Sequence, residues 1–447
     1  MGMSTELSRR TFNLQVDAWV SRAVNGGVSS FGDLLSTLPG VYPTQALDSL
    51  RRLRRAKRIS VGFASYIERQ ARTKPRPLGS LRSALLPPHP LDFEWRFSRS
   101  AAKTLLTQAS SLAGRADRIM LLGTPTLAVI AAKQTSASRY LYIGEDNAIS
   151  KQVSDIVARA PSTLEVRLCG PGALRAGEAQ VVVLDPPWYF DFLRPMLRAA
   201  AYVCRPGGHV LVSLPPIGTN SHVAEDRAKI LALFAKLSLH LVSVENAAIL
   251  YDTPYFEANA LKAEGYPNIP RAWRHGDLFV LEKAHEPPVI QIASAVRPRE
   301  WHEIVIGRMR LFVTRKAVRE NGSNSLLQSV VNGDVLPTVR RADPRRQEVQ
   351  VWTSGNRIFA SARPDLVRVA AFTAASGGVF DGGIRLSTVE KDAIARLSYY
   401  LGELAITEQS EERRGSFEET ECLLNGANLK SVILPNTSRR TRSGANT

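Results

Sequence analysis

The chain has 447 residues, of which 44% are hydrophobic, and this composition supports packed cores in two or three domains rather than a disordered protein. No run of about 18 apolar residues occurs, so neither a transmembrane helix nor a membrane partner is expected. The formal net charge of +17 instead favours a polyanionic partner, most often nucleic acid.

The cysteines bear on the compartment. Cys169, Cys204 and Cys422 are far apart and odd in number, and they form no CxxC or Cys/His cluster. Such usage is typical of a reducing environment, so we expect a cytoplasmic protein without a metal site. The N-terminal SRRTFN resembles the start of a twin-arginine export signal. Charged residues interrupt the stretch that follows it, so export is not expected.

The first segment, residues 1–75, is predicted to be a winged-helix domain. FGDLLSTL (31–38) has the pattern of a short amphipathic helix, which the following PGVYP ends. A second helix is expected over 44–58, because leucines recur there at near-helical spacing. RISVGFASYI (58–67) alternates apolar and other residues and is predicted to be the first strand of the wing.

The second of these helices carries many arginines outside its leucine stripe. A recognition helix of this kind can follow phosphates, which position a nucleic acid without reading its sequence. The candidate nucleic-acid-binding residues are Arg51, Arg52, Arg54, Arg55 and Arg58. Winged helices also serve as packing or dimerisation modules with a solvated basic face. The sequence therefore leaves open both the role of these arginines and the choice between a monomer and a homodimer.

The middle of the chain predicts an α/β domain. Residues 76–90 are rich in proline and basic side chains, which indicates an extended linker. From 91 to 285, short apolar runs alternate with helical stretches, which is typical of a Rossmann-like doubly wound sheet. The predicted strands are 118–123, 139–144, 163–169, 180–185, 209–215, 243–251 and 277–284. Ligands of such a sheet bind at the carboxyl ends of its strands.

The pattern changes again towards the C-terminus. Residues 286–407 contain two segments that alternate apolar and polar residues with a period of two, followed by a helical run over 388–405. We therefore expect a small β-rich α+β domain. The charged, Ser/Asn-rich residues 408–447 are predicted to form a disordered basic tail.

Two predicted strand ends offer groups for a nucleotide-like cofactor. The first carries Gly123, Thr124 and Pro125, where a glycine and the start of a helix permit close approach to backbone N–H groups. An ordinary strand–helix turn explains it equally well, because GxGxxG is absent. The second carries Glu145 and Asp146, either of which can accept hydrogen bonds from the hydroxyl groups of a ribose. The alternative there is a helix N-cap.

The third strand end carries DPPW. Asp185 can accept hydrogen bonds from an amine, and the rigid backbone of Pro186 and Pro187 can present a carbonyl group. Trp188 supplies a flat face for stacking. Together the three strand ends predict a nucleoside-bearing cofactor beside a site that orients an amine.

DPPW resembles the (D/N)PP(Y/F/W) motif of S-adenosylmethionine-dependent amino-methyltransferases. DFEWRFSRSAAKTLL, IMLLGTPTLA, YLYIGED and VVVLDPPW together resemble the group known as probable N6-adenine methyltransferases. The resemblance implies a class I methyltransferase sheet, S-adenosyl-L-methionine as cofactor, and methyl transfer to an amino group, adenine N6 of DNA or RNA being the first candidate. The implied catalytic residues are Asp185, Pro186, Pro187 and Trp188. The implied cofactor-binding residues are Gly123, Thr124, Pro125, Glu145, Asp146 and Trp95.

Two other interpretations stay open. Aminopropyltransferases that build branched polyamines also resemble this plan, with a winged helix before a DPP-containing Rossmann-like domain. They favour a GDDD-type acidic loop for a cationic polyamine, whereas the GTPT loop here has no carboxylate and the chain is basic. The third interpretation is a nucleic-acid-binding protein whose methyltransferase-like fold has lost catalysis.

Overall fold

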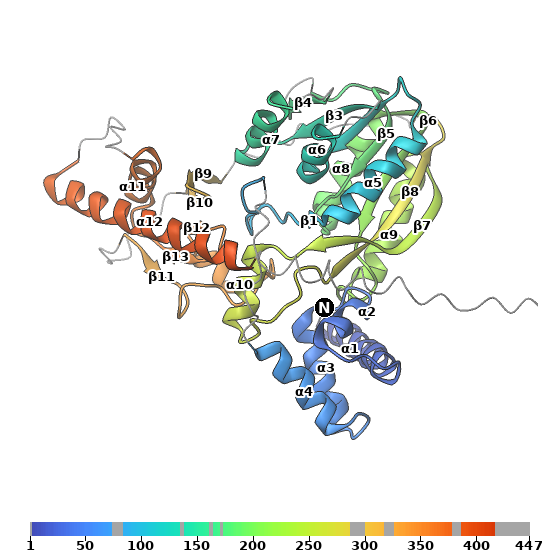
Figure 1. Ribbon diagram of the computed structural model, residues 1–447, viewed down its shortest axis with the longest axis horizontal. Helices are drawn as coiled ribbons and strands as arrows, with labels where there is room; N and C mark the ends of the chain where they lie inside the picture. The colour runs from blue at the N-terminus through green and yellow to red at the C-terminus, as the bar shows by residue number, and fades with distance from the viewer. Residues whose placement is uncertain are drawn as a thin grey trace, which may run out of the picture.

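The computed structural model describes residues 2–73, 84–134, 138–160, 164–169, 173–286, 300–316, 326–377 and 386–415. These residues form an N-terminal helical part, a central α/β domain and a smaller α+β domain (Figure 1). Among the described helices, none combines the length and the hydropathy needed to cross a bilayer.

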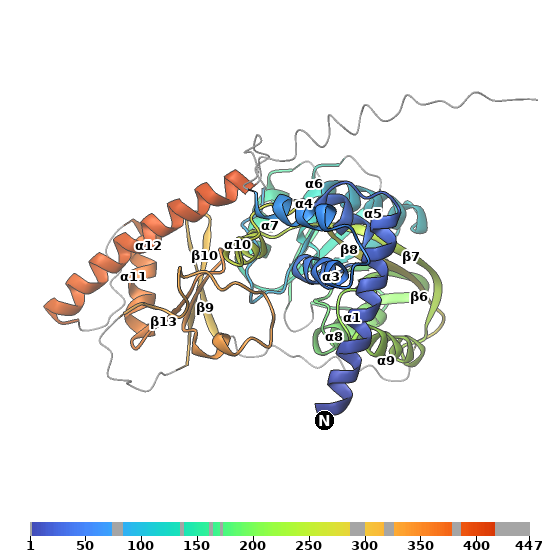
Figure 2. The same ribbon diagram turned by 90° about the horizontal axis from the view of Figure 1, so that it is seen from below.

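The N-terminal part consists of helices packed around one apolar cluster. They are α1 (Gly2–Asn25), α2 (Phe31–Thr37), α3 (Pro43–Arg55) and α4 (Val61–Arg72). Helices α2 and α3 lie where the sequence predicted a helix pair. Val16 of α1, Leu34 of α2 and Leu50 of α3 are buried in the shared cluster. Figure 2 shows α1 running past the end of α3.

The predicted wing strand over 58–67 is wrong, because α4 occupies this stretch. Ala64, Ile67 and Ala71 are buried and are spaced three and four residues apart, which places them on one face of a helix. The apparent alternation came partly from Val61, whose side chain is 63% exposed and contributes nothing to the core. The described N-terminal residues therefore form a helical unit without a wing.

The central sheet has eight strands among the described residues. They are β1 (Arg96–Phe97), β2 (Arg118–Leu122), β3 (Arg139–Gly144), β4 (Glu165–Leu168), β5 (Ala179–Leu184), β6 (Cys204–Leu214), β7 (Leu239–Asp252) and β8 (Arg274–Lys283), in the order β1-β7-β8-β6-β5-β2-β3-β4. Strands β2 to β6 are parallel, and their order β4-β3-β2-β5-β6 is the doubly wound order 3-2-1-4-5. Strand β8 lies antiparallel between β6 and β7. The prediction of a Rossmann-like sheet of the methyltransferase type is confirmed.

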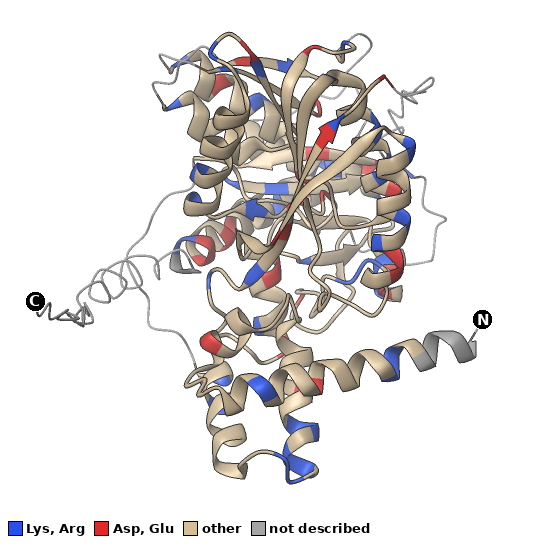
Figure 3. Ribbon diagram, turned by 90° about the vertical axis from the view of Figure 1, so that its right-hand side faces the viewer, with Lys and Arg blue, Asp and Glu red and all other residues tan. Residues whose placement is uncertain are grey.

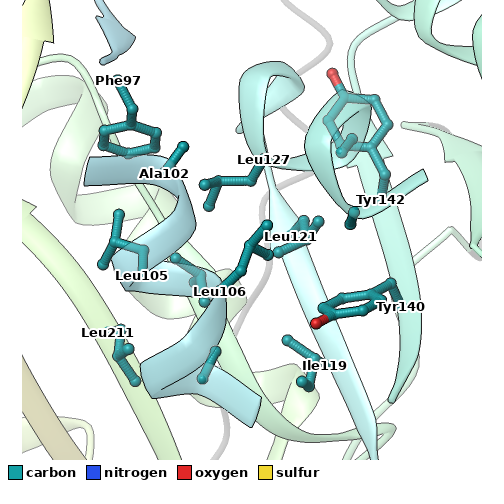
Figure 4. Close-up of a cluster of buried hydrophobic side chains, with 14 of the residues drawn as sticks. Phe97, Ala102, Leu105, Leu106, Ile119, Leu121, Leu127, Tyr140, Tyr142 and Leu211 are labelled. Atoms are coloured by element: carbon teal, nitrogen blue, oxygen red, sulfur yellow. The ribbon is translucent and has the colours of Figure 1, made fainter. Parts of the chain in front are cut away.

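Helices cover both faces of this sheet. Helices α5 (Arg99–Leu112), α6 (Pro125–Ala132) and α7 (Ala148–Ala158) share one apolar cluster with it. In Figure 4, Leu105 and Leu106 of α5 lie against Ile119 and Leu121 of β2. Helices α8 (Phe190–Val203) and α9 (Val223–Lys236) pack in a second cluster on the other face. A short helix, α10 (Tyr255–Ala263), lies between β7 and β8 in the chain.

The third part confirms the predicted small β-rich domain. Its antiparallel sheet has the order β11-β13-β12-β10-β9 and packs on two helices. Its elements are β9 (Trp301–Ile306), β10 (Met309–Thr314), β11 (Gln328–Ser329), the 3-10 helix η1 (Pro344–Glu348), β12 (Val351–Thr353), β13 (Ile358–Ala360), α11 (Pro364–Ser376) and α12 (Thr388–Gly415). Because α12 extends to Gly415, the predicted tail boundary at residue 408 falls inside a helix. Residues 416–447 lie outside the described residues.

The end of the predicted linker is buried rather than extended in solvent. The ring of His89 is fully buried, stacks on Phe312 at 4.0 Å and donates from Nε2 to the carbonyl oxygen of Trp352 at 3.1 Å. Burial lowers the pKa of His89 to about 3. Nearby, the fully buried Arg310 pairs with the carboxylate of Asp92. This stretch therefore joins the central domain to the C-terminal sheet, while residues 76–83 lie outside the described part.

Candidate active site

Three strand ends meet where the sequence predicted a ligand. Leu122 of β2 pairs with Ile143 of β3 on one side and with Leu184 of β5 on the other. Neighbouring strands are about 4.8 Å apart, so Gly123 and Asp185 leave the sheet side by side. The boundary between β2 and β5 is also the switch point of the strand order, where open α/β sheets bind their ligands.

The turn after β2, residues 123–125, carries backbone and hydroxyl groups that can contact a ligand. Gly123 has φ +66°, a conformation that glycine adopts without strain, and its N–H donates to the carbonyl oxygen of Ile143 at 2.8 Å. Thr124 precedes the first turn of α6, and Pro125 occupies that turn. The Thr124 side chain is only 2% exposed, and its hydroxyl has no hydrogen-bond partner among the described residues. A buried hydroxyl of this kind fits a polar ligand atom at the helix N-terminus.

The two acidic residues after β3 have different surroundings. Asp146 is 62% exposed and forms an ion pair with Lys151 at 3.2 Å. Asn147, rather than Asp146, caps α7. Glu145 is also exposed, and burial and the charge of Glu145 raise the pKa of the Cys169 thiol. Both acidic residues therefore stay candidates for a ribose.

Asp185 lies at the end of a hydrogen-bonded chain that runs through Tyr251 to Ser213. The hydroxyl of Tyr251 donates to Asp185 Oδ1 at 2.7 Å, and the Ser213 hydroxyl lies 2.5 Å from that of Tyr251. Burial, with a contribution from the charge of Glu94, raises the pKa of Asp185 to about 8, although the bond from Tyr251 acts in the opposite direction. Asp185 therefore changes its charge close to neutral pH, as a proton acceptor in catalysis must.

Aromatic rings lie next to Tyr251 and around Arg274. Trp188 stands edge-on to Tyr251, with ring centres 5.7 Å apart, and Trp95 stands edge-on to Trp273 at 6.1 Å. The guanidinium carbon of Arg274 lies 3.7 Å from the centre of the Trp95 ring and 5.6 Å from that of Trp188. Arg274 thus joins Trp95, predicted near the cofactor, to Trp188, predicted near the acceptor, through cation–π contacts.

A buried carboxylate holds this arginine. Glu257 of α10 is 0% exposed, and its Oε1 lies 3.2 Å from Nη2 of Arg274. Burial raises the pKa of Glu257 to about 7, against the opposing effects of Arg274 and of Tyr42. Tyr42 belongs to the N-terminal helical part and stands edge-on to Trp273 at 5.8 Å. The site is therefore assembled from the central sheet, α10 and the N-terminal part together.

Gly276 permits the close packing behind the site. A Cβ atom there would collide with the Ser213 hydroxyl and would lie 3.1 Å from the Tyr251 ring and 3.3 Å from Trp188. A side chain at this position would displace the group that holds Asp185. The glycine is thus required by the approach of strands β6, β7 and β8.

The arginines predicted to bind nucleic acid fall into two sets. Arg51 pairs with Glu68 at 2.6 Å and donates to the Tyr266 hydroxyl at 2.8 Å. Arg52 and Arg54 also form ion pairs, with Asp17 at 2.7 Å and with Glu68 at 3.8 Å. Arg55, the last residue of α3, and Arg58, which follows the helix, are both exposed. Figure 3 shows Lys and Arg gathered at the far end of these helices, away from the sheet. Of these five arginines, Arg55 and Arg58 are the exposed ones.

Two residues of the site carry no sequence signal. Arg274 and Glu257 lie in WRHGD and YFEANA, which match no motif that we recognised. Their distinguishing property is burial, which a sequence does not display. The part of the chain that the structure describes contains no group of three His, Cys, Asp or Glu side chains that could hold a metal ion.

The chain resembles known proteins in its fold but not in its sequence. No protein-family model and no curated protein matches the chain. Among solved structures, a branched-chain polyamine synthase mutein from Thermus thermophilus, in complex with N4-aminopropylspermidine and 5'-methylthioadenosine, is 14% identical with a TM-score of 0.47. The alignment covers 64% of this chain and 92% of the synthase. Geranyl diphosphate C-methyltransferase from Streptomyces coelicolor A3(2), in complex with Mg2+, geranyl diphosphate and S-adenosyl-L-homocysteine, is 12% identical with a TM-score of 0.30. That alignment covers 41% of this chain and 80% of the methyltransferase.

Proposed function

We propose that the chain is an S-adenosylmethionine-dependent transferase that methylates an amino group held at DPPW, the first candidate acceptor being adenine N6 of DNA or RNA. The hydrogen bond from Tyr251 to Asp185 carries this proposal. It fixes an amine-accepting carboxyl group at the switch point of the sheet, beside the Gly123 turn.

The residues around the Gly123 turn fit the cofactor. The backbone N–H groups at the start of α6 and the unpartnered Thr124 hydroxyl suit its polar atoms, and Glu145 or Asp146 suits its ribose. Pro125 holds the first turn of α6 in place. When bound, S-adenosylmethionine supplies a methyl group that a sulfonium has already activated.

Asp185 and its neighbours would orient the acceptor. The amine donates hydrogen bonds to the Asp185 carboxylate and to the Pro186 carbonyl, while Trp188 stacks on a flat acceptor. Methyl transfer would place positive charge on the acceptor nitrogen. Asp185 stabilises this charge and then takes the proton, and Tyr251 stabilises the ionised form of Asp185. A base in a duplex would have to be flipped out to reach this position.

One observation favours a second candidate. Glu94, Asp185 and Glu257 bring three carboxyl groups to the site of a strongly basic chain. An aliphatic ammonium must lose a proton before its nitrogen can attack, and a carboxyl group with a pKa of about 8 accepts that proton more readily than an ordinary aspartate. Aminopropyl transfer from decarboxylated S-adenosylmethionine to a polyamine therefore also suits the site.

A crossed assay separates the candidates. The purified chain is incubated with labelled S-adenosylmethionine or with labelled decarboxylated S-adenosylmethionine, each against DNA, RNA, protein and spermidine. Labelled nucleic acid supports adenine methylation, and a branched polyamine supports the second candidate. Retention of full activity in Asp185→Asn would overturn both, and calorimetry with S-adenosylmethionine tests cofactor binding without turnover.

A further inference from the structure

A loop of the C-terminal domain reaches the DPPW segment. Arg341 precedes η1, and its Nη2 lies 2.9 Å from Oδ2 of Asp191, which belongs to α8. Its guanidinium carbon is 5.2 Å from the centre of the Tyr189 ring and 5.3 Å from that of Phe192. Since Tyr189 directly follows Trp188, this arginine stands next to the proposed acceptor site.

A second arginine of the loop, Arg346, is half-buried and has few polar partners for its charge. The guanidinium carbon of Arg346 lies 4.5 Å from the centre of the Trp352 ring and 5.6 Å from that of Phe93. Among the described residues, its Nη1 has no hydrogen-bond partner, and its Nη2 has a long contact of 3.4 Å to the Pro90 carbonyl. No ion pair joins it to a described carboxylate, although Asp343 favours its charge from farther away. A half-buried guanidinium with so few polar partners can accept an anion.

The two arginines converge on one ring. The guanidinium carbon of Arg341 is 5.7 Å from the Phe93 ring centre, comparable to that of Arg346, and the two positive charges repel each other. Phe93 itself has φ +53°, which is strained for a bulky residue. Strain held next to like charges is typical of a site that binds something.

Tyr189 connects this pair to the amine site. Burial raises the pKa of Tyr189, while the charges of Arg346, Arg274 and Arg341 act in the opposite direction, so both the loop and Arg274 act on this hydroxyl. The loop RRADPRRQE, residues 340–348, contains four arginines and two carboxylates, so it remains basic after its internal pairs form. An anion bound here would lie alongside an acceptor whose amine reaches Asp185.

We propose that Arg341 and Arg346 form a phosphate-binding subsite that holds the backbone of a nucleic-acid acceptor beside its target base. This inference rests on the proposed function, whose substrate class it narrows. Planar guanidinium groups bind phosphate oxygens in pairs, which gives direction as well as charge. The C-terminal domain is thereby part of substrate recognition.

The test measures fluorescence anisotropy of a labelled single-stranded 12-nucleotide DNA, and of the matching RNA, over a salt series with the full chain. Each phosphate contact contributes about 0.7 to the slope of log K against log salt for a single strand. Arg341→Ala should lower this slope by about 0.7, and adding Arg346→Ala by about as much again, with at least a tenfold loss of affinity. The matched control is Arg363→Ala, an arginine of the same domain that is paired with Asp365 and about equally exposed.

Three results would overturn the inference. The salt slope could stay unchanged in both Arg341→Ala and the double variant, or Arg363→Ala could lose as much affinity as these variants. The wild-type chain could also bind neither the DNA nor the RNA strand. Arg346→Lys distinguishes loss of charge from misfolding. It keeps the positive charge, so its salt slope should be close to that of the wild-type chain and larger than that of Arg346→Ala. A failure of the proposed function can be told apart from a failure of this inference. If oligonucleotide binding follows the prediction but Asp185→Asn leaves transfer intact, the subsite stands and the catalytic assignment falls.

Discussion

Tyr251 on β7 holds Asp185 at the end of β5 through a hydrogen bond of 2.7 Å, although 66 residues separate them in the chain. Strands β6 and β8 lie between β7 and β5 in the sheet, so the side chain of Tyr251 must reach past both. Ser213 on β6 and the bare backbone of Gly276 on β8 make this reach feasible. The reactive carboxyl group thus depends on four strands.

The pH dependence of the reaction should report this bond. In the proposed reaction the ionised Asp185 accepts the amine, so kcat/KM should fall as the pH drops through the pKa of about 8. Tyr251→Phe removes a donor that lowers the pKa of Asp185, so the midpoint of the fall should move to higher pH. A profile of kcat/KM between pH 6 and 10, recorded for the wild-type chain and for Tyr251→Phe, measures this shift of the midpoint. An unshifted midpoint would show that Tyr251 does not act on Asp185.

Asp185→Asn should lose at least 100-fold in rate and yet gain stability. The folded state keeps a proton on Asp185 that the unfolded chain releases near the ordinary aspartate pKa of 3.8, so this residue costs stability as the pH rises from about 4 to 8. Asparagine removes the cost while still accepting from Tyr251. Urea unfolding should give a free energy of unfolding higher by about 1–3 kcal/mol at pH 9 and nearly equal at pH 4. An equal difference at both pH values would contradict the assignment.

Arg274→Ala should lower kcat by about 10- to 100-fold, because the walls formed by Trp95 and Trp188 lose the group between them. Free guanidinium at low millimolar concentration should restore part of the rate by occupying the space. Lysine should not replace arginine, since it lacks the flat face that stacks on Trp95. Asp185→Asn serves as the control, and guanidinium should leave it inactive. Absence of rescue would reduce Arg274 to a structural role.

Gly276→Ala should impair the site more than the fold. The new methyl group collides with Ser213 and presses on Tyr251 and Trp188, and overpacking of this kind costs about 1–3 kcal/mol. Activity should fall at least tenfold while the thermal transition stays cooperative. Gly265→Ala is the comparison for backbone strain, because Gly265 has φ +93° and open space around its Cα. That variant should keep full activity.

Arg310→Met should destabilise the chain by about 3–5 kcal/mol, because the half-buried carboxylates of Asp92 and Glu303 would lose the buried guanidinium that pairs with both. Arg363→Ala, which removes an exposed ion pair, should cost less than about 1 kcal/mol. Chemical denaturation of both variants measures the difference. If both variants lose the same free energy of unfolding, the ion pairs of Arg310 with Asp92 and Glu303 do not hold the domains together.

The sequence predicted the central sheet well because its strands are apolar runs that end in distinctive residues. DPPW and the Gly123 turn were placed correctly at neighbouring strand ends, since parallel strands with short connections leave few arrangements. The same reasoning failed for α4, where a helix with exposed apolar residues has the alternation of a strand. Period alone cannot separate the two when Val61 faces solvent.

The contacts around the site lay beyond prediction for a different reason. Glu257 and Arg274 belong to no motif of their own, and the sequence offered Tyr251 only as a residue near the substrate mouth, without its bond to Asp185. Each is recognised by what it contacts across the sheet or α10, and such contacts depend on tertiary packing. The burial of His89 shows the same limit, because a proline-rich segment does not reveal that a ring stacks on Phe312.

The pairing of Arg310 with Asp92 has a consequence for biosynthesis. The arginine follows its partner by 218 residues, so at 5–20 residues per second a nascent chain carries the unpaired carboxylate for about 10–40 s. During that interval the stretch around His89 has no sheet to dock on. The central domain must therefore leave the ribosome before its contact with the C-terminal sheet has formed. This contact can form only in a chain that has been translated past β10.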